Sequence, residues 1–286
     1  MQTNALNKLF RPRSIAVVGA SANEEKAGFQ MIRALLSFTG DLYPINPKSS
    51  EVLGLKVHPD LQSIGKPVDL AIFTLPAELC LDAMQDAASA GVGAIMIISG
   101  GFAESGERGR QLQNQMITFC KKHGIRLLGP NTSGYIQTFS NITATFAPSM
   151  NVLNKGPVGI IAQSGAVNLA LVALAGDQGL GVSLAVGIGN GEDVSSAEVI
   201  EYLADDNRTK VIIVYLEGVS DGRRLYNAIS YATMKKPVVI FPVGRANLNE
   251  FALSHTGNLV GSFDLKVAAL EQAGAVVVSS THELIY

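Results

Sequence analysis

The sequence has only two cysteines, Cys80 and Cys120, in a chain of 286 residues. This excludes a disulfide framework and a cysteine-based metal site, and we expect both cysteines to be small apolar core residues. The histidines His58, His123 and His282 show no metal-ligand spacing, so no metal site is predicted. Lys and Arg number 22 against 24 Asp and Glu, a net charge of −2, without basic runs. Nucleic acid is therefore not an expected partner.

Long hydrophobic runs are also missing. Apolar stretches such as Ala94–Ser99 and Val211–Leu216 fall far short of the roughly 20 residues that span a bilayer. The segment Met1–Arg13 is polar and mixed, unlike a secretory signal with its apolar centre. We therefore expect a cytoplasmic protein with no membrane partner.

The length of the chain and its pattern of apolar residues predict two α/β domains. The 286 residues, 47% of them apolar and 16% charged, are enough for two compact domains of ~150 residues each. Short β-rich runs alternate with helical patterns, which is typical of parallel sheets covered on both faces. Strands are predicted at residues 14–19, 41–45, 69–74, 94–99, 126–129, 158–162, 181–186, 211–216, 238–242 and 275–278. Helices are predicted near residues 29–38, 77–90, 107–123, 166–178, 195–204, 222–234 and 264–273, and the periodicity fades at the domain junction, residues 130–156.

A turn of small residues follows the first predicted strand. Gly19, Ala20 and Ser21 stand between that strand and a helix that begins after Gly28. Backbone amides at such a turn and at a helix start can hold a phosphate. The spacing is not a regular G-x-G-x-x-G, and a tight turn packed on the helix would select the same residue types.

The second strand helps to choose the ligand. A NAD site usually has an acidic residue near this position for the ribose hydroxyls, whereas here the strand is followed by Lys48. A lysine favours an additional phosphate, as in NADP or the phosphorylated ADP portion of coenzyme A. A solvated surface charge is the alternative for Lys48.

The second half carries two further candidates. Ser164, Gly165 and Ala166 open a helix directly after a strand, where free amides and the positive helix end can bind phosphate. An ordinary Ser164 N-cap explains the same residues. Glu217 follows the strand at residues 211–216, which places it at the carboxyl edge of the sheet, where open α/β folds bind ligands.

Several motifs in a fixed order resemble those of the acyl-CoA synthetases that form a nucleoside diphosphate (NDP), the superfamily of the succinyl-CoA synthetase α subunit. The resemblance covers nearly the whole chain and includes Gln163-Ser164-Gly165-Ala166 and Tyr215-Leu216-Glu217-Gly218. The other motifs are Ser14–Ser21, Pro44–Lys48, Thr74-Leu75-Pro76, Ile98–Glu104, Leu128-Gly129-Pro130-Asn131 and Ser254-His255-Thr256-Gly257. The resemblance implies a Rossmann-like CoA-binding domain, residues 1–137, and a flavodoxin-like succinyl-CoA-ligase-type domain, residues 138–286.

The resemblance also implies roles for individual residues. His255 matches the histidine that becomes phosphorylated, and Glu217 matches the acid that holds it. The residues that match the surroundings of CoA are Gly19, Ala20, Ser21, Lys48, Pro76, Ser99 and Gly100. His255 lies in a small, polar stretch that predicts a loop, and a neutral imidazole near pH 7 is a good nucleophile toward an acyl phosphate.

The implied enzyme is an acid–thiol ligase. It converts acyl-CoA and phosphate to CoA and acyl phosphate, transfers the phosphoryl group to His255 and then to ADP or GDP, all reversibly. The sequence contains neither an ATP-grasp nucleotide domain nor the phosphate-binding loop G-x-x-x-x-G-K-[ST]. We therefore expect the Mg-nucleotide to be bound by an ATP-grasp β-type subunit or domain, in a hetero- or homo-oligomer.

Two other readings compete. One is a binding module that senses CoA or acyl-CoA, because bacterial protein lysine acetyltransferases look similar over this region, including Thr281-His282-Glu283-Leu284. Those relatives typically lack the reactive histidine, whereas His255 is present here. The other reading is a nicotinamide oxidoreductase, which rests on the first glycine turn alone.

Overall fold

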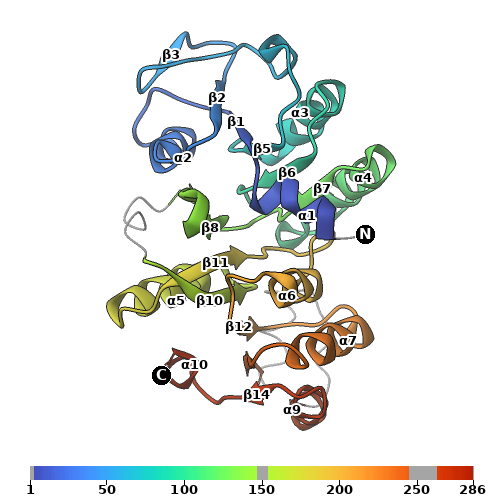
Figure 1. Cartoon of the computed structure of the whole chain (residues 1–286). Coiled ribbons are helices and arrows are strands. Elements are labelled where there is room, and N and C mark those ends of the chain that lie inside the picture. The colour runs from blue at the N-terminus through green and yellow to red at the C-terminus, as the bar shows by residue number, and fades with distance from the viewer. Residues whose placement is uncertain (1–2, 147–153, 245–262, 286) are drawn as a thin grey trace.

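The computed structural model describes residues 3–146, 154–244 and 263–285 and shows two α/β domains. In Figure 1 the first domain lies above the second. The first domain holds a five-stranded parallel sheet in the order β2-β1-β5-β6-β7. Its strands are β1 (Ser14–Val18), β2 (Asp41–Ile45), β5 (Leu70–Phe73), β6 (Ala94–Ile97) and β7 (Arg126–Leu128). A small antiparallel hairpin, β3 (Glu51–Val52) and β4 (Leu55–Lys56), follows β2.

Helices cover both faces of this sheet. Helices α3 (Ala77–Ser89) and α4 (Glu107–His123) bury Met84 and Met116 against one face. Helices α1 (Thr3–Phe10) and α2 (Ala27–Leu35) contribute to a core on the other face. That core continues without a break into the second domain, so the two domains share buried apolar contacts.

The second domain holds a seven-stranded sheet in the order β14-β13-β12-β10-β11-β8-β9. The strands β10 (Lys155–Ala162), β11 (Val182–Gly187), β12 (Val211–Leu216), β13 (Val238–Pro242) and β14 (Val276–Val277) are parallel. The strands β8 (Tyr135–Gln137) and β9 (Ile142–Ala144) are antiparallel additions at one edge.

The helices of this domain also lie on two sides. Helices α6 (Ser196–Asp205) and α7 (Gly222–Thr233) face the shared core, whereas α5 (Gly165–Asp177) and α10 (Thr281–Ile285) cover the opposite face. Helix α9 (Phe263–Gln272) packs beside β13, β14 and α7. A complete Ser195–Glu198 capping box starts α6, which satisfies backbone amides that the first turn leaves unpaired.

The predicted fold class is confirmed, and each predicted strand and helix overlaps an observed one. Residues 130–156, predicted as the domain junction, contain the two strands β8 and β9, which join the second sheet. Each strand is three residues long and buried throughout, so it offers no alternation of apolar and polar residues. The proposed boundary between residues 137 and 138 falls inside this hairpin.

Polar contacts fix the second domain against the first. Arg126, at the start of β7, pairs with Asp193 at 3.0 Å and with Glu198 at 3.0 Å. The Asp193 carboxylate also accepts the Leu127 amide at 2.7 Å. These three charged side chains are only 15–17% exposed, so each charge is stabilised mainly by its oppositely charged partner rather than by water.

We expect Arg126→Met to lower the free energy of unfolding by about 1–3 kcal/mol. The substitution leaves two largely buried carboxylates, Asp193 and Glu198, without their cation. Urea unfolding measures the change, and Arg110→Met is the control because its pair with Glu107 spans 4.0 Å on the surface. An Arg126→Met effect no larger than that of the control would contradict this account.

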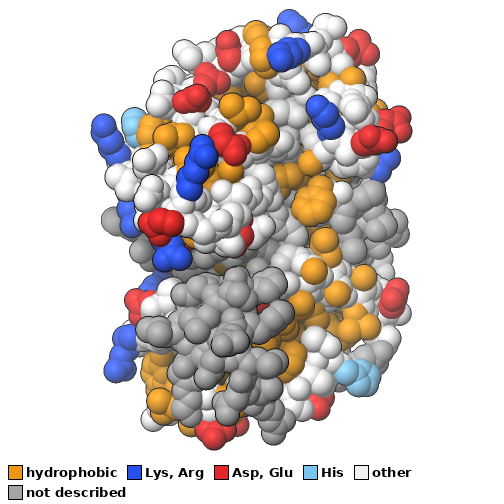
Figure 2. All heavy atoms as spheres, turned by 180° about the vertical axis from the view of Figure 1, so that it is seen from behind, with side chains coloured by type: hydrophobic (Ala, Val, Ile, Leu, Met, Phe, Trp, Pro, Cys, Tyr) orange, Lys and Arg blue, Asp and Glu red, His pale blue; other side chains and the backbone are white. Residues whose placement is uncertain are grey.

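In the described part of the chain, no helix is long and apolar enough to cross a membrane. On the face seen in Figure 2, acidic and basic side chains of the described residues are mixed rather than gathered by sign.

Candidate functional site

The turn after β1 packs tightly against the start of α2. Gly19 has a φ of 94°, which favours glycine, and a Cβ on Gly28 would overlap the Gly19 carbonyl oxygen. The Gly19 and Ala20 amides donate to the carbonyl of Ile45 at 3.1 and 3.2 Å. Because these two amides are bonded to the end of β2, an anion at this turn would meet amides farther along, at the start of α2.

Asn46 joins this turn to the segment that carries Lys48. Its Nδ2 donates to the Ala20 carbonyl at 2.6 Å, and its Oδ1 accepts the Lys48 amide at 2.8 Å. Lys48 itself is exposed. Asn46 therefore links the Gly19–Ala20 turn to the backbone at Lys48. The sequence shows Asn46 only as one residue of the motif Pro44–Lys48, without this linking role.

Pro76, Ser99 and Gly100 lie farther along the same carboxyl edge. Pro76 precedes α3, and a Cβ on Gly101 would lie 3.1 Å from the Cβ of Ala77, so the two loops touch. The buried hydroxyl of Ser99 makes no regular hydrogen bond with the described residues. A buried hydroxyl whose neighbour is only a weakly hydrogen-bonding thiol can still bond to a polar group of a ligand.

The thiol next to Ser99 belongs to Cys80. Burial raises the pKa of Cys80 to about 12, and burial also raises the pKa of Cys120 to about 12. Both cysteines are free and buried, which confirms that they serve as small apolar core residues rather than reactive groups.

In the second domain, Ser164 does cap α5, since its Oγ accepts the Val167 amide at 3.4 Å. This cap is compatible with phosphate binding at the same place, because other amides of the first turn have no partner within the helix. Asn168, on this first turn, is buried; its Nδ2 donates to Ser133 Oγ at 3.2 Å, and its Oδ1 has no partner among the described residues.

Gln163 connects this helix start to Glu217. Its Oε1 accepts the amides of Glu217 at 2.6 Å and Gly218 at 2.9 Å, and its Nε2 donates to the Gly218 carbonyl at 2.8 Å. Because β10 and β12 are neighbours, Glu217 and Ser164 lie at adjacent strand ends. In the sequence Gln163 is recognisable only as part of a motif, and its hydrogen bonds to the Glu217 and Gly218 amides are visible only in the structure.

His255 lies in residues 245–262, outside the described residues. The chain enters this segment after β13, where the Val243 amide donates to the Leu216 carbonyl at 2.8 Å. Lys266, just beyond the segment, donates to the carbonyls of Val243 at 3.1 Å and Glu217 at 3.4 Å. Burial lowers the pKa of Lys266. The described residues Val243 and Lys266, on the two sides of the segment, therefore both bond to the Leu216–Glu217 end of β12.

One short segment, residues 129–133, joins the two carboxyl edges. The Asn131 amide donates to the Ser99 carbonyl at 3.0 Å. Two residues later, Ser133 packs against the start of α5, the candidate phosphate site: a Cβ on Gly165 would lie 3.1 Å from the Ser133 Cβ. The candidate CoA residues and the candidate phosphate residues thus form one continuous row across both domains.

Comparison with known proteins gives this row a family. Residues 13–138 match the model "CoA binding domain", and residues 155–286 match "Succinyl-CoA ligase like flavodoxin domain". The chain is 30% identical to subunit alpha 2 of the ADP-forming succinate–CoA ligase of Archaeoglobus fulgidus, over 82% of each protein. The chain belongs to the NDP-forming acyl-CoA synthetase superfamily. The resemblance inferred from the motifs is therefore confirmed.

Two other members of the superfamily are longer than this chain. Subunit alpha of ADP-forming acetate–CoA ligase I from Pyrococcus furiosus is 36% identical over 95% of the chain and 60% of its own length. The dinucleotide forming acetyl-coenzyme A synthetase 1 of Ca. Korarchaeum cryptofilum, in complex with phosphate and ADP, is 34% identical, with a TM-score of 0.93. The match covers 98% of this chain and 61% of that one. This chain thus spans about three fifths of these two relatives.

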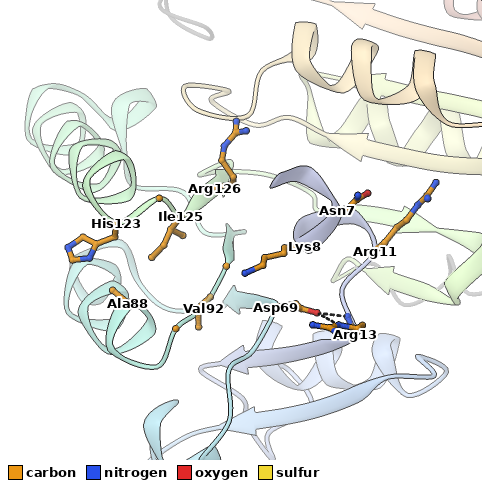
Figure 3. A pocket seen from close by; sticks show the side chains of 13 residues that line it. Asn7, Lys8, Arg11, Arg13, Asp69, Ala88, Val92, His123, Ile125 and Arg126 are labelled. Carbon is orange, nitrogen blue, oxygen red and sulfur yellow. Dashed lines mark hydrogen bonds and ion pairs between the residues drawn. The ribbon is translucent and has the colours of Figure 1, made fainter. Parts of the chain in front are cut away.

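A depression in the surface lies away from the row of candidate residues. It has a volume of about 680 Å³ and lies among the amino ends of the first sheet's strands, with Lys8, Arg13 and Asp69 on its wall (Figure 3). Arg13 pairs with Asp69 at 3.2 Å. Arg126, on another side of the depression, is already paired with Asp193 of the second domain. The depression contains none of the predicted site residues.

We expect Gln163→Met to lower the free energy of unfolding by about 1–3 kcal/mol, because the amides of Glu217 and Gly218 lose their acceptor. It should also slow any reaction that needs Glu217 in place. Thermal unfolding measures the first effect. Gln111→Met, on the exposed side of α4, is the matched control and should leave stability unchanged within about 0.5 kcal/mol. Equal stability of the two variants would contradict the proposed anchoring.

Proposed function

We propose that this chain is the CoA-binding, α-type portion of an ADP- or GDP-forming acyl-CoA synthetase. The observation that carries the proposal is the continuous row from Lys48 and Gly19, through Ser99 and Asn131, to Gly165 and Glu217. Its first part suits a phosphorylated thiol carrier, and its second part suits phosphate. The phosphate and ADP bound to the Korarchaeum relative support the same reading.

The first step joins the two halves of the row. Phosphate at the start of α5 attacks the thioester carbonyl of acyl-CoA; the C–S bond breaks, and CoA leaves as the thiol after taking up a proton. Residues Ser99 and Gly100 would flank the acyl-CoA, and Ser164, Gly165 and Ala166 would hold the phosphate. The positive end of α5 stabilises the negative charge of the phosphate and of the acyl phosphate product.

The second step forms phosphohistidine. A His255 nitrogen attacks the phosphorus of the acyl phosphate, the bond between phosphorus and the acyl oxygen breaks, and the acid leaves as a carboxylate. Glu217 would hold the other imidazole nitrogen and balance the positive charge that develops on the ring. Transfer to ADP would complete the cycle on an ATP-grasp partner, which binds the Mg-nucleotide.

The test is incorporation of radiolabelled phosphate into the purified chain during incubation with a panel of acyl-CoAs. The expected result is acid-labile label on the protein with at least one acyl-CoA, released as ATP or GTP when ADP or GDP and the ATP-grasp partner are added. Coenzyme A binding without label, even with the partner present, would overturn the proposal in favour of a CoA sensor. The acyl-CoA that gives the most label identifies the substrate.

A further inference from the structure

A polar cluster joins the two domains next to Ser99 and Gly100. Glu104 lies in the short turn Ala103–Ser105, and its Oε1 accepts the amides of Gly101 at 2.7 Å and Phe102 at 3.1 Å. A Cβ on Gly100 would lie 3.1 Å from the same oxygen. The carboxylate therefore holds the backbone that directly follows the candidate CoA residues.

The other carboxylate oxygen reaches the second domain. Glu104 Oε2 accepts from Asn190 Nδ2 at 2.6 Å, and Asn190 belongs to the loop after β11. The same Nδ2 donates to Gln113 of α4 at 2.7 Å. The Asn190 backbone amide donates to the Pro130 carbonyl at 3.0 Å, and its Oδ1 accepts from Asn131 at 3.4 Å. One asparagine thus contacts three separate segments near the first sheet.

The cluster favours a negative charge on Glu104. Partial burial would raise the pKa of this carboxyl, but hydrogen bonds from Asn190 and from the Phe102 and Gly101 amides outweigh burial and hold the pKa below its usual value. Glu104 is therefore ionised at neutral pH and accepts all three hydrogen bonds.

We propose that Glu104 and Asn190 are a positioning pair that fixes the Ser99–Phe102 loop against the ligase-type domain. This inference rests on the proposed function. The thioester would be held by the first domain and the attacking phosphate by the second, so their alignment depends on the contact between domains. A misplacement of about 1 Å can slow such a reaction about 100-fold. Neither residue needs to touch a substrate for this role.

The hydrogen-bond pattern allows a test by exchange of donor and acceptor. Asn190→Asp places a second carboxylate against Glu104, and no hydrogen-bond donor remains between the two ionised groups. Adding Glu104→Gln restores the pair, because the glutamine amide donates to the carboxylate introduced at position 190 while its oxygen still accepts the Gly101 and Phe102 amides. Glu107→Gln is the control, since Glu107 is exposed and its charge pairs only weakly with Arg110, at 4.0 Å.

The rate of phosphate labelling, the affinity for CoA and the thermal midpoint are measured for each variant. We expect Asn190→Asp to slow labelling about 10- to 100-fold. The double variant should recover to within about threefold of the original chain. The control should stay within about twofold. Labelling is measured well below the thermal midpoint of each variant, so a slower rate is not caused by unfolding, and recovery in the double variant identifies the pair.

The outcomes separate this inference from the proposed function. Suppose that the original chain is labelled. If Asn190→Asp is then labelled at the normal rate, or if the double variant does not recover, the positioning role alone is overturned. An unlabelled original chain overturns the proposed function. Hydrogen exchange of the Gly101 and Phe102 amides still decides in that case whether the pair holds the loop: Asn190→Asp must speed exchange and the double variant must slow it again.

Discussion

Replacement of His255 by alanine is expected to remove phosphate labelling completely, a loss of at least about 10³-fold. In the proposed cycle the imidazole is the protein group that forms a covalent bond to phosphorus, and alanine leaves no nucleophile at this position. Binding of CoA should be unchanged, because the candidate CoA residues belong to the first domain. The measurement is labelled phosphate per chain, together with CoA affinity by calorimetry.

His123→Ala is the matched control for that experiment. His123 ends α4 at the opposite edge of the first sheet, where its ring stacks on Phe119 at 4.2 Å. Its loss should leave labelling within about twofold. Label that persists in His255→Ala would show that another group carries the phosphoryl, and the proposed second step would be wrong.

Gly28→Ala is expected to disrupt the first-domain site while leaving the chain folded. The added methyl would overlap the Gly19 carbonyl oxygen and approach the Ala20 Cα to 3.1 Å. The obstructing atoms are backbone, so α2 must move away from the turn. We expect about 1–3 kcal/mol lower stability, from overpacking, and CoA affinity reduced at least about tenfold, equivalent to about 1.4 kcal/mol.

Gly222→Ala provides the control of the same chemical size. Gly222 opens α7, and a Cβ there would meet nothing within 4 Å. Alanine favours helix over glycine, so stability should stay equal or rise by up to about 1 kcal/mol. Urea unfolding and calorimetric titration with CoA measure both variants. Unchanged CoA affinity in Gly28→Ala would mean that the contact between the turn and α2 does not shape a CoA site.

Part of the site is visible in the sequence because it follows from local pattern. Gly19, Ser99 and Glu217 each stand directly after a short apolar run that forms a strand. Parallel strands bring such residues to one edge of a sheet, whatever the rest of the chain does. The family resemblance added His255 and the ligase chemistry, which a single histidine in a polar stretch does not reveal.

Other parts were missed because their signal is short or nonlocal. Helix α1 has Leu6, Leu9 and Phe10 at helical spacing, but its eight residues are too few for this pattern to stand out. The hairpin of β8 and β9 is buried throughout and shows no alternation. Gln163 and Asn46 stood inside quoted motifs, but their hydrogen bonds reach residues on neighbouring strands. A side-chain amide that bonds to a distant backbone leaves no pattern in the sequence.

The sequence alone determined the alternation of strands and helices, because apolar periodicity reflects which side of each element is buried. It also determined which residue types stand at the strand ends. Only the tertiary structure decided how the two edges meet: Asn131 bonds to Ser99, Ser133 packs on Gly165, and Asn190 reaches Glu104 across 86 positions. Such contacts depend on how two whole domains pack, since the spacing of residues along the chain does not fix their separation in space.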